Sequence, residues 1–193
     1  MLQELAEAGA KVLNAQAVEW ARRAKITLHA RKTADFPPRD GTTPNETVAR
    51  PDRDSTAGVR AIAAMDRIAL VLTDSQDMGR FLDASADLDL PLVDAASAGR
   101  EASAVVPLLN VPDWDKRRAI LEQRLGSVLR LTEGLALVSV VGDGLATSAA
   151  RAFAALAEFS PRSFGAGPLR ISAAIPAEHT LAAQRALHDL FVG

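Results

Sequence analysis

The amino-acid sequence predicts an α+β fold that contains a duplicated module of strands and helices. From residue 59 onwards, short apolar runs typical of strands alternate with amphipathic segments typical of helices. The order strand, turn, helix, strand, strand, helix over residues 68–125 returns in similar form over residues 135–191. The 193 residues are 48% hydrophobic and 24% charged, which is enough to form a buried core. Modules of this kind cover one face of a sheet with helices and leave the other for a partner.

Two helices and a strand are predicted before the first repeat. Residues 2–8 and 15–24 have apolar residues at helical spacing, and Gly9 ends the first of these helices. Residues 26–31 alternate apolar and polar side chains, which indicates a strand. Residues 34–58 contain four prolines, several charges and few large apolar residues, so this segment is predicted to be a linker.

The first repeat is predicted from its apolar runs and from one helix start signal. Strands are predicted over residues 59–64, 68–73, 90–93 and 102–109. Helices are predicted over residues 79–88 and 114–125. Asp113 is the predicted N-cap of the second helix, because a carboxylate oxygen can accept a hydrogen bond from a free backbone N–H. Arg118 and Glu122 are four residues apart, which predicts an ion pair on a solvated face of this helix.

The second repeat has the strongest strand of the chain. Strands are predicted over residues 135–141, near residue 163 and over residues 169–175, with residues 142–144 (GDG) as a turn after the first. Helices are predicted over residues 148–159 and 178–191. Their apolar sides contain Ala152, Phe153, Leu156 and Phe159 in the first helix and Leu187, Leu190 and Phe191 in the second.

Composition excludes several classes of function. The net charge of −2 and the 4% aromatic content argue against a nucleic-acid partner. The absence of cysteine removes disulfides, thiolate nucleophiles and cysteine-ligated zinc, and the three histidines lack metal-ligand spacing. No apolar run approaches the about 20 residues of a membrane span, and acidic residues stand where a signal peptide needs a basic start. We therefore expect a cytoplasmic chain with no membrane and no metal.

No complete catalytic motif is present in the sequence. The GDG segment is followed by Thr147 where a dinucleotide-binding loop needs glycine, and no serine lies in a nucleophile-elbow pattern. Residues 74–79 (DSQDMG) instead link a predicted strand to a predicted helix, where free backbone N–H groups can bind the carboxylate of a small amino acid. A nearby acid, Asp94, could then bind the ammonium group. An ordinary polar turn is the alternative, and spacing alone favours it.

Two blocks of the sequence resemble bacterial aspartokinases, and the resemblance covers almost the whole chain. Residues 9–33 (GAKVLNAQAVEWARRAKITLHARKT) resemble the end of the kinase domain. Residues 132–146 (TEGLALVSVVGDGLA) and 171–191 (ISAAIPAEHTLAAQRALHDLF) resemble the last ACT domain. The stretches EGLALV, MGRFL and LPLVD are similar to the lysine-sensitive monofunctional type.

The resemblance implies tandem ferredoxin-like ACT domains (βαββαβ), the first inserted in the second and preceded by the last helix and strand of an amino-acid-kinase domain. It implies this division: residues 1–33 as the end of the kinase domain, 34–58 as a linker, 59–66 as the first strand of the second ACT domain, 67–125 as the first ACT domain and 126–193 as the remainder of the second.

The resemblance also implies a regulatory function. Aspartokinases use ATP and Mg²⁺ to phosphorylate the β-carboxylate of aspartate, and their ACT pair binds an end-product amino acid and forms a homodimer. Lysine is the implied effector, with threonine possible. Because no kinase core is recognisable in this sequence, we expect no catalytic residue and no cofactor in this chain, whose partner would be the kinase domain of the full-length enzyme.

The implied effector site lies at an ACT–ACT interface between subunits. Its implied residues are Ser75, Met78, Phe81, Leu82, Val93, Asp94 and Ser97. Asp94 would face the amino group of the effector, and backbone groups near Phe81 would face its carboxylate.

Two other interpretations stay open. Residues 95–101 (AASAGRE) depart from the family pattern after Asp94, which suggests an ACT pair that has lost its effector and serves only as a dimerisation or interaction module. The chain could also belong to a fused enzyme, such as an aspartokinase joined to a diaminopimelate decarboxylase.

Overall fold

The computed structural model describes residues 24, 26–31, 46–49, 58–109 and 111–193. The helices predicted over residues 2–8 and 15–24 fall outside these residues, apart from residue 24. Strand β1 (Leu28–Arg31) pairs antiparallel with strand β2 (Glu46–Ala49), so that Leu28 lies opposite Ala49. Strand β2 lies within the predicted linker, and its two β-branched residues, Thr47 and Val48, favour a strand.

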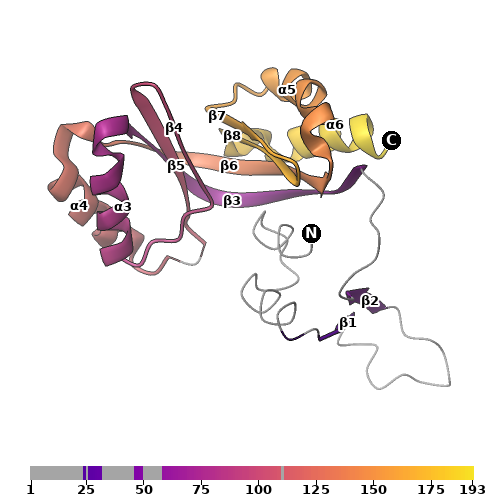
Figure 1. Cartoon of the computed structure of the whole chain (residues 1–193), viewed down its shortest axis with the longest axis horizontal. Coiled ribbons are helices and arrows are strands. Elements are labelled where there is room, and N and C mark those ends of the chain that lie inside the picture. The colour runs from indigo at the N-terminus through magenta and orange to yellow at the C-terminus, as the bar shows by residue number, and fades with distance from the viewer. Residues whose placement is uncertain (1–23, 25, 32–45, 50–57, 110) are drawn as a thin grey trace.

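A six-stranded antiparallel sheet forms the main body (Figure 1). Its strands in spatial order are β4 (Asp94–Ala98), β5 (Glu101–Pro107), β3 (Gly58–Asp74), β6 (Arg130–Asp143), β8 (Arg170–Pro176) and β7 (Ser163–Ala166). Its helices are α3 (Met78–Asp87), α4 (Trp114–Leu125), α5 (Ala149–Ala157) and α6 (Thr180–Phe191). Figure 1 shows α3 and α4 at one end of the long strands β3 and β6, and α5 and α6 at the other end.

The two long strands are shared by two ferredoxin-like units. In the first unit, the C-terminal half of β3 is strand one and the N-terminal half of β6 is strand four, with β4, β5, α3 and α4 between them. In the second unit the roles are exchanged, because β6 continues as strand one and the N-terminal half of β3 supplies strand four. Within the shared sheet, the four strands of each unit therefore have the spatial order 2-3-1-4, and the first unit is inserted in the second.

Each long strand changes unit at a β-bulge. Asp66 and Arg67 together lie opposite Ala136, and Glu133 and Gly134 together lie opposite Ala69. Arg67 has φ 60° and Gly134 has φ 73°, the left-handed conformation that many bulges require. The two bulges flank one ordinary pair, Ile68 opposite Leu135, and begin the similar segments DRIALV and EGLALV.

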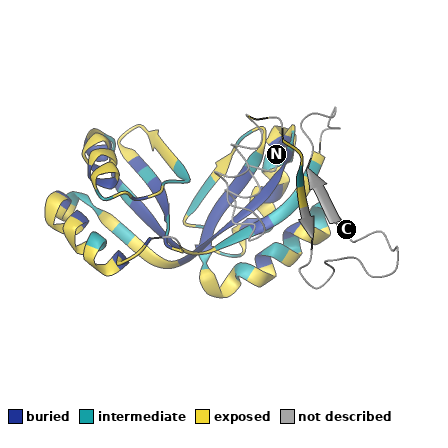
Figure 2. Ribbon diagram, turned by 90° about the horizontal axis from the view of Figure 1, so that it is seen from below, coloured by how far each residue is buried: buried dark blue, intermediate teal, exposed yellow. Residues whose placement is uncertain are grey.

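Three larger apolar clusters, and a small fourth one of Ala63 and Val141, lie among the described residues. The first lies between α3, α4 and the sheet of the first unit, and the second lies between α5, α6 and the sheet of the second unit. The third lies on the face of the sheet that the helices do not cover, where the curl of the sheet brings the two units together. It contains Ile68, Leu70, Val105, Leu135, Leu137 and Ala174. Figure 2 shows that the buried residues lie mainly in the strands, with exposed helices on the outside.

Several predicted boundaries change in the structure. The strands predicted over residues 59–64 and 68–73 are one strand, β3, and the turn predicted at residues 142–144 begins later because β6 extends to Asp143. Residues 90–93 are not a strand, and β4 follows them instead. This prediction followed apolar content, but Leu90 is buried against the helices of the first unit while β4 is an edge strand of small, mostly exposed residues.

One prediction for the helices is confirmed only in position, and another is wrong. Asp113 is the N-cap residue of α4, as predicted, but it has φ 52° and its side chain makes no capping bond; the N–H of Lys116 bonds to its carbonyl oxygen instead. Phe153 of α5 does not point into the apolar core under this helix, because it is 50% exposed. Its ring meets that of Phe164 edge to face, with 5.1 Å between the ring centroids. Ala152 and Leu156 are the buried residues of α5.

Within the described ranges, no helix is long and apolar enough to cross a membrane. The same residues contain no group of three or more His, Cys, Asp or Glu placed to hold a metal ion.

Candidate functional site

The predicted site begins at the turn between β3 and α3, where two serines meet. Ser97 Oγ of β4 donates a hydrogen bond to Ser75 Oγ at 2.8 Å, and Ser75 Oγ donates to the Glu101 carbonyl oxygen at 3.0 Å. The Ser75 N–H donates to the Arg100 carbonyl oxygen at 2.9 Å. These bonds fasten the turn to the β4–β5 hairpin, so the backbone N–H of Ser75 is not available to a ligand in this conformation.

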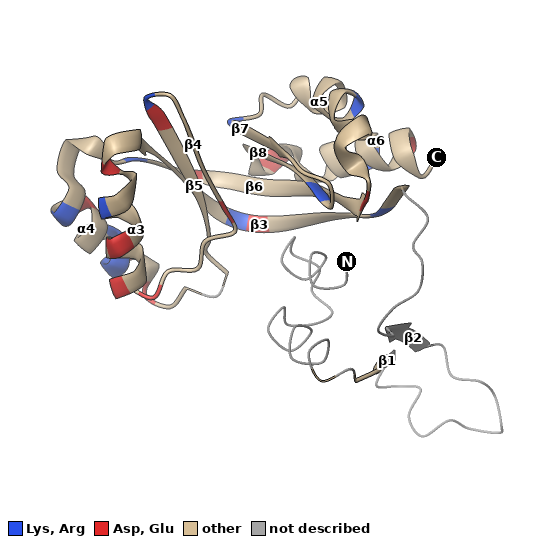
Figure 3. Cartoon of the chain, in the orientation of Figure 1, with Lys and Arg blue, Asp and Glu red and all other residues tan. Residues whose placement is uncertain are grey.

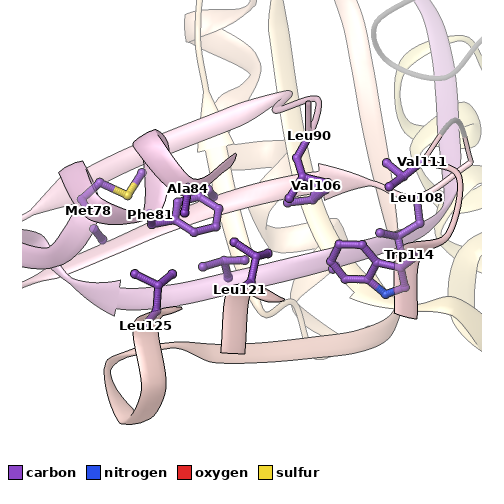
Figure 4. Close-up of a cluster of buried hydrophobic side chains, with 14 residues drawn as sticks. Met78, Phe81, Ala84, Leu90, Val106, Leu108, Val111, Trp114, Leu121 and Leu125 are labelled. Carbon is purple, nitrogen blue, oxygen red and sulfur yellow. The ribbon is translucent and has the colours of Figure 1, made fainter. Parts of the chain in front are cut away.

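The three predicted residues of α3 have different environments. Phe81 is fully buried and Met78 is nearly so, and Figure 4 shows both in the cluster that also contains Leu121 and Leu125 of α4. Leu82 is 40% exposed. The side chains of Phe81 and Met78 therefore stabilise the first unit, and Leu82 is the residue of the three that a partner could contact.

Asp94 lies where the two units meet, and the second unit binds its carboxylate. Arg170 Nη2 lies 2.6 Å from Asp94 Oδ1, and Ser172 Oγ donates to Asp94 Oδ2 at 3.0 Å. Arg170 Nη2 also donates to the Val93 carbonyl oxygen at 3.0 Å, and the Val93 side chain packs against the third apolar cluster. The side chain of Arg170 is 14% exposed and that of Asp94 is 37% exposed.

The seven predicted residues do not converge within one chain. Successive side chains of a strand point to opposite faces, so Ser97 and Asp94 of β4 face opposite ways. Their neighbours on β5 agree: Ala102, opposite Ser97, belongs to the core under the helices, and Val105, opposite Asp94, belongs to the cluster between the units. Ser75 and Ser97 are therefore brought together, whereas Asp94 and Val93 lie on the other face of the sheet.

Sequence reasoning missed Arg170 and Ser172. Both belong to the strand RISAAIP, whose alternate residues Ile171, Ala173 and Ile175 are buried under α5 and α6. The alternation in this strand predicts a polar pair on the other face. It does not identify the partner, because Asp94 is 76 residues away in the sequence.

A second polar network joins α4 to the bulge of β6. Trp114 Nε1 donates to Glu133 Oε1 at 2.9 Å, and Arg118 lies 3.0 Å from the same oxygen and 2.8 Å from Glu122 Oε1. The hydrogen bond with Glu122 and its charge, together with the charge of Glu133, raise the pKa of Arg118, which stays protonated. The predicted Arg118–Glu122 pair is confirmed, and Figure 3 shows charged residues along both α3 and α4.

Comparison with known proteins adds the family context. No family model matches the chain. The aspartokinases of Geobacillus stearothermophilus and Thermus thermophilus are 25% and 29% identical to it over 197 and 202 residues, each match covering 97% of the chain. The chain spans about half the length of these curated relatives, 48% and 49% respectively.

Solved structures of aspartokinases and of an aspartate kinase regulatory subunit are similar to this chain in fold. Escherichia coli aspartokinase III in complex with aspartate and ADP has a TM-score of 0.81 and 19% identity, covering 100% of this chain and 45% of that one. The complex of the same enzyme with lysine and aspartate has a TM-score of 0.73 and 20% identity, covering 98% of this chain and 45% of that one. The regulatory subunit of aspartate kinase from Thermus thermophilus has a TM-score of 0.57 and 25% identity, covering 69% of this chain and 99% of that one.

These similarities support an aspartate kinase regulatory region. The α+β fold of this region, tandem ferredoxin-like ACT domains with the first inserted in the second, is the one that the resemblance implied. The first and second ferredoxin-like units are accordingly its two ACT units.

Proposed function

We propose that the chain is the allosteric region of an aspartate kinase and binds an end-product amino acid for feedback inhibition. The full-length enzyme would transfer phosphate from ATP to L-aspartate, giving 4-phospho-L-aspartate for lysine, threonine and methionine synthesis. The observation that carries this proposal is the match of the chain to regulatory subunit structures, one of which is covered almost completely. The proposal includes a homodimer formed through the ACT units in the cytoplasm, and domain divisions at the residues predicted above.

Lysine is the proposed effector, with threonine as the second choice. One neighbour of this fold is an aspartokinase in complex with lysine and aspartate, which supports an amino acid as the ligand class. The proposed site contains Ser75, Met78, Phe81, Leu82, Val93, Asp94 and Ser97. Asp94 is the strongest candidate for the ammonium group, because its carboxylate is partly exposed on an edge strand.

A second candidate function has its own supporting observation. Both carboxylate oxygens of Asp94 have partners within the chain, and the strand that carries Asp94 otherwise contains only alanine and serine. An ACT pair whose candidate ammonium ligand is used internally could serve only as a dimerisation or interaction module.

Isothermal titration of the whole chain with lysine, threonine and methionine separates the two functions. We expect heat and saturation with lysine, or with threonine if the effector differs, and a dimer by light scattering with or without ligand. Saturation by none of the three amino acids would contradict the effector function and favour the interaction module. A monomer at micromolar concentration under both conditions would contradict the proposed homodimer.

A further inference from the structure

The two ACT units are joined by two strand crossings with the same local geometry. The chain passes between the units within β3 and within β6, and both passages contain a bulge with one left-handed residue, Arg67 or Gly134. The regular ladder is interrupted on both sides of the Ile68–Leu135 pair. Because bulges bend strands and leave a residue out of the ladder, the two interruptions form one line across which the curled sheet can bend.

Away from these crossings, a polar contact holds the units together. Asp94 of the first unit accepts from Arg170 and Ser172 of the second unit, and the Val93 carbonyl oxygen accepts from the same guanidinium. The contact lies beside the third apolar cluster, with Asp94 opposite Val105 and Arg170 on the same strand as Ala174. Bending along the bulges changes the distance between β4 and β8, so this contact must break if the units separate.

The ion pair between Asp94 and Arg170 can break and form again. Arg170 Nη1 is buried without a hydrogen-bond partner among the described residues, so the guanidinium is only partly satisfied where it lies. A partly buried ion pair of this kind offsets much of its Coulomb attraction by desolvation, and it is strongly unfavourable when one partner is removed. Small changes at Asp94 or Arg170 can therefore move the balance between closed and open units.

We propose that Asp94, Arg170 and Ser172 form a latch that holds the two ACT units closed, and that the units open by bending at the bulges around Arg67 and Gly134. The contact forms within the chain without an effector, so this proposal does not rest on the proposed function. A change of charge at Asp94 opens the latch, and the bulges convert that change into a rotation of one unit relative to the other.

Distance measurement by electron paramagnetic resonance tests the latch directly. The chain has no cysteine, so spin labels at Asp83→Cys on α3 and Ala154→Cys on α5, both exposed positions, report on the two units without further substitutions. We expect one main distance in the labelled chain. Arg170→Gln should add a second distance and raise the ratio of open to closed units at least tenfold, whereas Arg170→Lys should stay close to the labelled parent.

Two further variants keep the test decisive. Arg185→Gln removes the same charge from an exposed position of α6 and should leave the distance distribution unchanged. Asp94→Asn keeps the shape of the side chain and should open the units as Arg170→Gln does, which provides a second route if one variant folds poorly. Distance distributions of Arg170→Gln and Asp94→Asn that coincide with that of the parent would overturn the proposal.

Discussion

The guanidinium of Arg170 lies 2.6 Å from the carboxylate of Asp94, and the two residues belong to different ACT units. The proposed effector site includes Asp94, so an effector ammonium and Arg170 would compete for one carboxylate. The strength of effector binding should then depend on a residue that is not in the proposed site.

Replacing Asp94 should weaken effector binding. In Asp94→Ala the ammonium group of lysine loses its charged partner, and we expect the dissociation constant to rise at least tenfold, about 1.4 kcal/mol. Isothermal titration of both proteins checks this. Asp83→Ala removes the same charge from an exposed position of α3 and should bind as the wild type does. Equal affinity of Asp94→Ala and wild type would exclude Asp94 from the site.

Replacing Arg170 should have the opposite effect on affinity. Arg170→Gln frees the Asp94 carboxylate, so lysine no longer has to displace a resident cation, and we expect severalfold tighter binding. Arg170→Lys keeps the cation and should bind close to the wild type. Weaker binding by Arg170→Gln would instead mean that Arg170 orients Asp94 for the ligand.

Gly142 should tolerate no side chain. A Cβ atom at this position would fall on the Gly58 carbonyl oxygen and would come within 3.0 Å of Val59 Cα, all of it backbone that pairs with β6. We expect Gly142→Ala to reduce the free energy of unfolding by about 1–3 kcal/mol, measured by urea denaturation. The control is Gly79→Ala in α3, where no atom beyond the neighbouring residues and the backbone of the same helix lies within 4 Å of the added Cβ. Alanine is the better helix former, so this variant should be neutral or more stable by up to about 1 kcal/mol.

Phe81 and Leu82 are neighbours in the predicted site, and stability measurements should separate them. Phe81 is fully buried, so Phe81→Ala should cost about 3–5 kcal/mol through lost burial and the cavity that remains. Leu82 is 40% exposed, and Leu82→Ala should change the free energy of unfolding by about 0.5 kcal/mol or less. If Leu82→Ala nevertheless weakens lysine binding, the loss is a contact rather than a folding defect. A large loss of stability in Leu82→Ala would mean that this side chain is covered in solution.

The elements with strong local signals were predictable from the sequence. Helix α4 occupies residues 114–125 as expected, because Trp114, Leu121 and Leu125 have helical spacing and Gly126 follows the last of them. Strand β4 was not predictable, because Ala95, Ala96 and Ala98 have low strand propensity and depend on pairing with β5. Continuity of β3 also depends on tertiary pairing, since Asp66 and Arg67 separate two apolar runs that look like two strands.

The residues of the proposed site could be named from the sequence, but their arrangement in space could not. The polar turn at Ser75 and the acid at Asp94 stand out in the sequence, but the alternation of β4 places Ser97 and Asp94 on opposite faces. A contact such as Asp94 with Arg170 depends on how a curled sheet returns on itself, and no local pattern contains that information.

The exchange of strands between the ACT units has a consequence for how the region can be divided. Each unit takes its fourth strand from the long strand that starts the other unit, so no single cut produces two complete sheets. Cleavage between Met65 and Ile68 would separate one edge strand of the second unit from the chain that continues into the first. The two ACT units should accordingly unfold in a single cooperative transition. A truncation or recombination that divides them would leave at least one unit without a complete sheet.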